Sequence, residues 1–209
     1  MASTPNTFLW FEIFGAPAEN KPFYAAVVPF VHVDAPMGDL VYTMFGPARD
    51  RSVGGYRSPE PERPHGWLPY LGVPDVAAAT AAAQGAGATV VMPPTDIGPG
   101  ISSTIVEPGG TTLALFRSHQ DASESDPPTG LHSIAWTELF SADVPATLAF
   151  FEGALGLQRK GVPTGEGGTV TLLGEHTSGT LALAGDATTT ERLGFNGREE
   201  GITALASVL

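Results

Sequence analysis

The amino-acid sequence predicts an α+β protein built from a repeated unit of strand, helix and further strands. The chain has three tryptophans, Trp10, Trp67 and Trp136, and each opens an apolar, strand-like stretch. A punctuated turn and an alanine-rich segment with helical character follow each stretch. The first and third copies also share a Trp-x-Glu motif and a pair of adjacent rings, Phe23-Tyr24 and Phe150-Phe151. A repeat of this kind predicts a protein built from several copies of one structural unit.

The first unit begins with an aromatic and aliphatic run over residues 8–14, which we interpret as a strand. We expect Asn20 to cap the following helix, with Pro22 tolerated in its first turn. The Ala35–Gly38 segment should separate two further strands. A long loop rich in glycine, proline and charged residues should flank the fourth strand of this unit on both sides. These later strands are expected at residues 31–33, 40–45 and about 53–56.

The second unit begins at Trp67, and the third follows an acidic, proline-containing linker over residues 120–130. Asp75 is a typical N-cap for a helix over 76–84. Glu107-Pro-Gly-Gly110 predicts a tight hairpin, because Pro presets one dihedral and Gly permits positive φ. The third unit should contain a strand over 134–140, a helix over 143–155, and strands at 169–173, 180–184 and 202–209.

Composition excludes several classes of function. A net charge of −12 argues against nucleic acid and anionic membranes as partners, because both require clustered basic residues. The chain has no cysteine, so disulfides, thiolate nucleophiles and cysteine metal sites are excluded. The N-terminus shows no secretory signal and no apolar run reaches membrane-spanning length. We therefore expect a cytoplasmic protein.

The ordered units resemble the glyoxalase/bleomycin-resistance/dioxygenase superfamily, also called the vicinal oxygen chelate fold. Three phrases carry the resemblance: Gly72–Val76, Val91–Ile97 and Glu107–Phe116. Tandem-repeat bacterial proteins labelled glyoxalase-like or hydroxylase are the most similar group. The resemblance implies that two βαβββ modules pair edge to edge into one cupped mixed sheet. Residues 1–119 would form this domain, 120–130 a linker, and 131–209 a third, truncated and unpaired module.

Metal-using members of this superfamily take His, Gln or Glu ligands from four strands of the cup. Spacing places the corresponding positions at Trp10 or Leu9, in Val53–Gly55, near Leu68 and at Ala114. None of these side chains binds a divalent cation. We therefore expect no metal and no cofactor in this cup.

The cup instead carries aromatic residues, which suit a flat or bulky apolar ligand. Strand alternation through the four positions predicts the lining residues. A one-residue error would exchange every lining residue for a core residue. The predicted set is Trp10, Glu12, Phe14, Tyr42, Leu68, Tyr70, Ala114 and Phe116.

Two residues are candidates for acid–base chemistry. Glu12 alternates with Trp10 on its strand, so it shares the face of the predicted site. Its repeat equivalent, Glu138, favours the alternative that this glutamate makes a structural hydrogen bond. His65 precedes the first strand of the second unit and could reach the mouth of the cup. The other histidines are interpreted as surface or rim residues.

Three functions are compatible with these features. The first is a metal-free small-molecule-binding protein that sequesters an aromatic or polyketide-like compound, as in antibiotic resistance. The second is a metal-independent enzyme of natural-product biosynthesis, catalysing cyclisation, rearrangement or proton transfer with Glu12 or His65. The third is an interaction scaffold with a vestigial cup. The sequence does not separate the first two, because a cup with one carboxylate serves either.

The odd number of units predicts an assembly. If residues 8–118 close on themselves, the third module would expose apolar surface and an unpaired sheet edge. We expect a homodimer in which residues 131–209 of two chains pair around a two-fold axis. The alternative is that the third module folds back over the first domain and caps its cup in a monomer.

Overall fold

The structure is a computed structural model, and it describes most of the chain except its N-terminus and several segments, most of them in the second half. The described residues are 7–38, 40–58, 66–120, 134–141, 143–163, 169–173, 180–185, 190–195 and 206–207. No helix in this part of the chain is long and apolar enough to cross a membrane.

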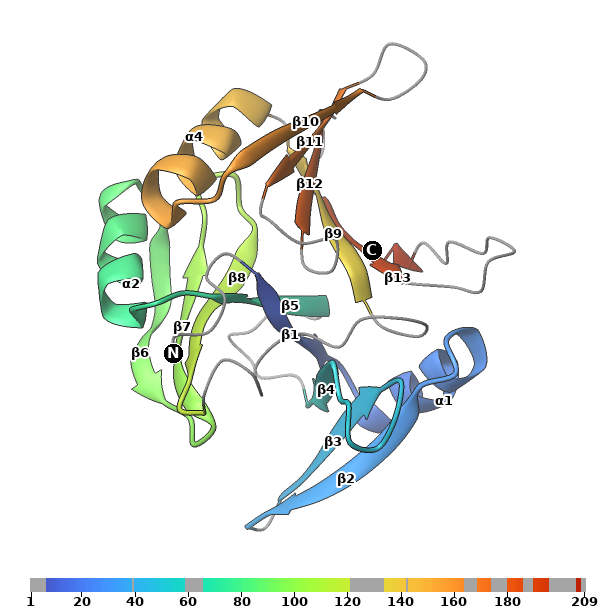
Figure 1. The fold of residues 1–209 in the computed structure, drawn as a ribbon. Helices are drawn as coiled ribbons and strands as arrows, with labels where there is room; N and C mark the ends of the chain where they lie inside the picture. The colour runs from blue at the N-terminus through green and yellow to red at the C-terminus, as the bar shows by residue number, and fades with distance from the viewer. Residues whose placement is uncertain are drawn as a thin grey trace.

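The first two modules have the same topology and share one sheet (Figure 1). The first consists of β1 (Phe8–Phe14), α1 (Pro17–Val27), β2 (Val31–Met37), β3 (Leu40–Gly46) and β4 (Gly54–Arg57). The second consists of β5 (Gly66–Gly72), α2 (Val76–Gly85), β6 (Thr89–Asp96), β7 (Gly100–Val106) and β8 (Thr112–Ser118). In each module the last strand lies parallel to the first. Strands β1 and β5 pair antiparallel and join the modules into an eight-stranded sheet, ordered β2-β3-β4-β1-β5-β8-β7-β6.

The third module repeats this topology in a separate sheet. It consists of β9 (Ile134–Ser141), α4 (Val144–Leu155), β10 (Arg159–Pro163), β11 (Thr169–Leu173) and β12 (Thr180–Gly185). Strand β13 (Thr190–Phe195) then pairs antiparallel with β9, as β5 pairs with β1, and β14 (Ala206–Ser207) lies beyond it. The predicted α+β class and the repeated βαβββ module are confirmed.

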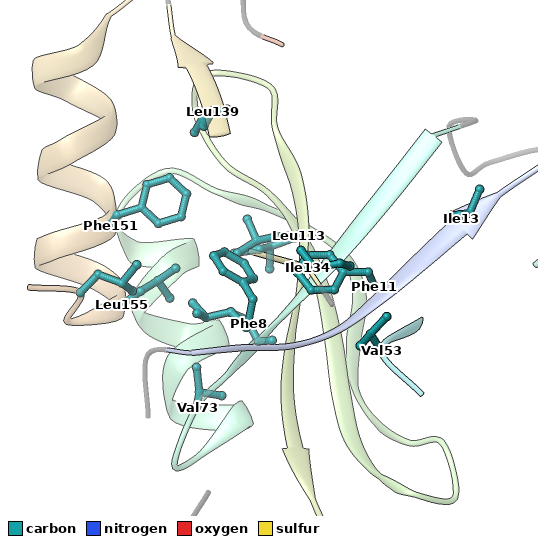
Figure 2. Packing of buried hydrophobic residues seen from close by; sticks show 14 of the residues in the cluster. Phe8, Phe11, Ile13, Val53, Val73, Leu113, Ile134, Leu139, Phe151 and Leu155 are labelled. Atoms are coloured by element: carbon teal, nitrogen blue, oxygen red, sulfur yellow. The ribbon is translucent and has the colours of Figure 1, made fainter. Parts of the chain in front are cut away.

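The third module does not leave its apolar surface exposed, so that expectation is wrong for the described residues. Figure 2 shows Leu139, Phe151 and Leu155 beside Phe8 and Leu113 in one buried cluster. Helix α4 packs against α2 (Figure 1), and β9 is paired on both sides, with β12 and with β13. The alternative that the module folds back over the first domain is observed in part, because described residues of the third module pack against the first two modules in the main core cluster. That the module also caps the cup stays a prediction. The predicted linker lies outside the described residues, so the domain boundaries stay a prediction.

Proline causes the main differences in element bounds. Helix α1 begins at Pro17 after Ala16, so Asn20 lies inside the helix and is not its cap. Pro17 suits the first position of a helix for two reasons. Its φ angle is already helical, and the N–H group that proline lacks has no hydrogen-bond partner within the helix at this position. The β2–β3 pairing continues through Pro36, where a break was expected, and its turn falls at Gly38 with φ of 62°. An edge strand such as β2 tolerates proline.

Two local predictions of the sequence are confirmed. The Asp75 carboxylate accepts a hydrogen bond from the Ala78 amide at 2.9 Å and so caps α2. The hairpin after β7 is closed by Glu107, which is only 2 % exposed. Its two carboxylate oxygens accept hydrogen bonds from the amides of Gly109 at 2.7 Å and Thr111 at 3.0 Å.

We expect Glu107→Ala to lower the free energy of unfolding by about 2–4 kcal/mol, because the amides of Gly109 and Thr111 lose a buried, charged acceptor. Asp75→Ala is the comparison, with an expected loss of about 1 kcal/mol for an exposed cap. Urea denaturation of the two variants and the native chain measures both values. Equal losses in the two variants would contradict the role given to Glu107.

Candidate ligand-binding site

The eight-stranded sheet has two chemically different faces. One packs against α1 and α2 and carries Phe11 and Ile13 of β1 in the main core. Trp10, Glu12 and Phe14 alternate with them and lie on the opposite face, which we call the site face. A second buried cluster occupies the site face, formed by Phe14, Leu68, Tyr70 and Ala114 with Trp10, Ile97 and Phe116 packed against it.

The structure brings every predicted lining residue to the site face. Six of them belong to the second cluster or pack against it. The other two, Glu12 and Tyr42, are joined to it by hydrogen bonds from Trp10 and Tyr70. The strand faces were therefore assigned correctly from the sequence. That these residues bind a ligand stays a prediction.

Glu12 lies at the centre of a hydrogen-bond network on this face. The Tyr42 hydroxyl donates to Glu12 Oε1 at 3.0 Å, and the Tyr70 hydroxyl donates to Oε2 at 2.7 Å. Trp10 Nε1 in turn donates to the Tyr42 hydroxyl at 3.1 Å. Arg57 places a guanidinium nitrogen 3.7 Å from Glu12 Oε2, with the Glu12 side chain 8 % exposed. A buried carboxylate is thus held by two phenols and a cation.

The environment keeps both phenols protonated. Burial raises the pKa of Tyr42 well above its ordinary value, and the nearby Glu12 charge raises it further. The pKa of Tyr70 is raised by the same causes in the same order. Both residues therefore act as hydrogen-bond donors to Glu12 throughout the neutral pH range.

Gly55 makes this network possible. It pairs with Glu12 across β1 and β4 and lies in the Val53–Gly55 segment, where one of the four metal positions was expected. A Cβ atom at Gly55 would overlap the ring and hydroxyl of Tyr42. The missing side chain therefore leaves the space through which Tyr42 reaches Glu12.

We expect Gly55→Ala to displace Tyr42 and to break the link from Trp10 through Tyr42 to Glu12. The matched control is Gly85→Ala at the end of α2, where a Cβ atom meets no neighbour within 4 Å. A crystal structure of Gly55→Ala checks this directly. A Tyr42 hydroxyl still within hydrogen-bond distance of Glu12 would contradict it.

The residues at the expected metal positions do not fit a divalent cation. Register places Gly55 and Leu68 opposite Glu12, and Ala114 opposite Tyr70. Glu12 is not one of these positions, and both its oxygens accept hydrogen bonds from tyrosines. Within the described ranges, no group of three or more His, Cys, Asp or Glu side chains could hold a metal ion.

Sequence reasoning missed two polar residues of the site face. Arg57 pairs with Phe14 across β1 and β4, and its guanidinium lies 5.5 Å from the Phe14 ring centre. Extending the expected strand by one residue beyond Tyr56 would have found it. Ser102 lies opposite Phe116, is fully buried, and its hydroxyl has no hydrogen-bond partner among the described residues. Only the strand register reveals its proximity.

The remaining acid–base candidates lie elsewhere. His65 falls outside the described residues, so its predicted role is not tested. The backbone of Glu138 lies in β9 of the other sheet, and its side chain is also outside the described part. His32 Nε2 lies 3.1 Å from the Tyr56 hydroxyl, and burial followed by the Lys21 charge lowers its pKa. His119 contacts Asp96 at 3.2 Å on the exposed surface.

The sequence is similar to a protein named as a putative glyoxylase and to one named for anthracycline biosynthesis. It is 30 % identical over 145 residues to the putative glyoxylase CFP32 of Mycobacterium bovis, covering 66 % of this chain and 54 % of that protein. It is 32 % identical over 103 residues to the anthracycline biosynthesis protein DauV of Streptomyces sp. strain C5, covering 46 % of this chain and 37 % of DauV. The chain thus spans about half the length, or less, of these relatives. No protein-family model matches it.

These relatives, together with the fold, indicate the glyoxalase/vicinal oxygen chelate superfamily. Solved structures show the same fold at low sequence identity. A halotolerant catechol dioxygenase, BphC, superposes with a TM-score of 0.61 at 12 % identity, covering 95 % of this chain and 72 % of that one. A 4-hydroxymandelate synthase variant from Streptomyces coelicolor superposes with a TM-score of 0.54 at 17 % identity, covering 89 % and 64 %. In this vicinal oxygen chelate protein the aromatic site face occupies the centre of the shared fold.

Proposed function

We propose that this vicinal oxygen chelate protein binds a flat aromatic or polyketide-like small molecule on its site face without a metal ion. One observation carries the proposal: Glu12 is buried among aromatic side chains and held by the hydroxyls of Tyr42 and Tyr70. A fixed polar group in an apolar, aromatic wall is typical of small-molecule sites, where it orients the ligand.

The chemistry of the site indicates the ligand class. Trp10, Phe14 and Phe116 provide apolar ring surface, which suits stacking or edge contact with fused rings. Each carboxylate oxygen of Glu12 accepts one tyrosine hydrogen bond and retains capacity for a second. A hydroxyl or phenol group of the ligand can donate a hydrogen bond to this remaining acceptor position. The name of DauV connects one relative to anthracycline biosynthesis, which supports a polycyclic hydroxylated ligand.

The second candidate function is a metal-independent enzyme acting on the same ligand class. The word biosynthesis in the name of DauV is the observation that favours it. Glu12 would then take or donate a proton, with His65 as the other candidate. Sequestration ranks first because Glu12 is held in a fixed network with Tyr42, Tyr70 and Arg57, and a fixed polar group suits the orientation of a bound ligand.

Two measurements test the proposal. Native mass spectrometry of tag-free protein should detect a co-purified organic ligand, and elemental analysis should find no stoichiometric divalent metal. An anthracycline aglycone incubated with the protein should be recovered unchanged. Recovery of an altered compound supports the enzyme instead, and a stoichiometric metal ion would contradict the proposed metal-free site.

We expect Tyr70→Phe to weaken binding of an anthracycline aglycone about tenfold, because the loss of one hydrogen bond leaves Glu12 less well held. Tyr70→Ala should weaken it further by removing the ring. Tyr56→Phe is the matched control, since Tyr56 lies in the main core on the other face. Isothermal titration calorimetry measures all three. An unchanged affinity in Tyr70→Ala would exclude this face as the site.

A further inference from the structure

A buried serine of the eight-stranded sheet has a hydroxyl group without a hydrogen-bond partner. Ser102 lies in β7, and its side chain is fully buried. Its Oγ makes no hydrogen bond with any residue that the structure describes. Buried polar groups are normally paired, because an unpaired one has lost its hydrogen bonds to water without replacement. The Ser102 hydroxyl therefore requires a partner that the described chain does not supply.

The strand register places Ser102 on the site face. It pairs with Phe116 of β8, which packs against the site-face cluster. Residues that pair across neighbouring strands point to the same face of a sheet. The next residue, Ser103, pairs with Leu115 of the main core and so points to the opposite face. The two adjacent serines thus lie on different sides of the sheet.

A structural role alone does not explain a serine at this position. The site face accepts alanine in a fully buried position, at Ala114 on the neighbouring strand β8. An alanine at position 102 would fit the same space and would leave no unpaired hydroxyl. Ser103 shows the usual arrangement of a buried serine, because its hydroxyl donates a hydrogen bond to the Met92 carbonyl at 2.9 Å. The difference between the two serines points to a partner from outside the chain.

Ser102 and Glu12 lie on opposite sides of the aromatic wall. Strands β1, β5, β8 and β7 are neighbours in this order, with Glu12 on the first and Ser102 on the last. Three strand spacings therefore separate their backbones, about 14 Å along the sheet. Tyr70 and Phe116 lie on the two strands between them, with ring centres 5.9 Å apart at an interplanar angle of 76°. A ligand that contacts both polar groups must therefore be longer than a single ring.

A ligand can reach Ser102 by displacing a partly buried ring. Phe116, the cross-strand partner of Ser102, lies at the edge of the site-face cluster and is only partly buried. Its ring leans over Gly100, since a Cβ atom there would lie 2.7 Å from two of the ring carbons. Changes of side-chain rotamer are common when a binding surface meets its ligand. Movement of this one ring would bring the ligand to the Ser102 hydroxyl.

We propose that the Ser102 hydroxyl is a second polar contact for the ligand, on the side of the aromatic wall opposite to Glu12. This contact presupposes the proposed function of the site face. It narrows the ligand to an elongated, fused-ring compound with an oxygen at each end. The end at Glu12 must donate a hydrogen bond, as a hydroxyl or phenol does. A serine hydroxyl both donates and accepts, so the other end can carry a carbonyl, quinone or hydroxyl oxygen.

Two adjacent serine variants test this contact by calorimetric titration and urea denaturation. Ser102→Ala should weaken binding of an anthracycline aglycone about tenfold, because one hydrogen bond to the ligand is lost. Its urea midpoint should not fall, because the folded chain loses no internal hydrogen bond. Ser103→Ala is the matched control, with a lower midpoint from the lost bond to Met92 and an unchanged affinity. An unchanged affinity in Ser102→Ala, or a midpoint as low as that of Ser103→Ala, would overturn the proposal.

A double variant separates this contact from the proposed function itself. Distant contacts contribute independently, so Tyr70→Phe combined with Ser102→Ala should bind about a hundredfold more weakly than the native chain. A loss no larger than that of one single variant would place both residues at the same end of the ligand and overturn the proposal. If Tyr70→Ala weakens binding and Ser102→Ala does not, the site face stands and Ser102 is not a contact. If neither variant weakens binding, or the native chain does not bind the aglycone, both proposals fail.

Discussion

Replacing Glu12 with Gln is expected to abolish measurable binding of an anthracycline aglycone and to lower the free energy of unfolding by about 2–4 kcal/mol. The amide has one acceptor oxygen where the carboxylate has two, so one of the tyrosine hydrogen bonds is lost. Its NH₂ group then faces either the Tyr42 hydroxyl, or the Tyr70 hydroxyl and the Arg57 cation together. Calorimetric titration and urea denaturation measure the two effects.

Two control variants separate binding from stability. Glu107→Gln alters another buried carboxylate, at the β7–β8 hairpin, and should lower stability without changing affinity. Glu138→Gln alters the glutamate that follows Trp136 as Glu12 follows Trp10, and it should leave affinity unchanged. If Glu107→Gln reduces affinity as much as Glu12→Gln, the effect on binding is general destabilisation and the site is elsewhere.

Cooperative unfolding is expected when the pH rises by one to two units above about 10. The chain contains four tyrosines, at positions 24, 42, 56 and 70. Burial is the largest cause of a raised pKa at each of them, with the Glu12 charge contributing at Tyr42 and Tyr70. In the folded chain all four therefore stay protonated at a pH where free tyrosine ionises.

The direction of this pH effect follows from the linkage between proton binding and folding. A tyrosine with a raised folded pKa retains its full contribution to stability below the unfolded value of about 10. That contribution is lost as the pH rises toward the folded value, because only the unfolded chain releases the proton. A tyrosine in this pH range removes up to about 1.4 kcal/mol per pH unit, so Tyr42, Tyr56 and Tyr70 together remove up to about 4 kcal/mol per unit, a large part of the stability of a domain.

Near-ultraviolet phenolate absorbance and far-ultraviolet circular dichroism, followed together against pH, test this result. The two signals should change in one coincident transition, because the tyrosines ionise when the chain unfolds. Independent titration of the four phenols near pH 10 with an unchanged circular dichroism signal would contradict the burial described for them. A titration at neutral pH after urea unfolding provides the reference spectrum for the exposed rings.

Much of the site face was predictable because strands alternate. Once Trp10 and Glu12 were placed on one face of β1, the period of two placed Phe14 with them, and the same rule placed Leu68 with Tyr70 and Ala114 with Phe116. Arg57 was missed because the expected strand ended at Tyr56. Ser102 was missed because only the pairing of β7 with β8 brings it beside Phe116.

Rules that depend only on neighbouring residues predicted some ends of helices and strands correctly and others wrongly. Asp75 caps α2 as predicted, because the capping hydrogen bond depends on residues three apart in sequence. Pro36 does not end β2, because this strand lies at an edge of the sheet. Position in the sheet is a tertiary property, and no short window of sequence reports it.

By itself, the sequence determined the βαβββ repeat, the superfamily and the residues that share the site face. These depend on periodicity and on motifs that recur within the chain. The tertiary structure alone decided that Tyr42 and Tyr70, 28 positions apart, converge on one carboxylate. It also decided that α4 packs on α2 and leaves Phe23 uncovered. Such contacts join residues distant in the chain, and their geometry depends on how whole modules pack, which no local pattern encodes.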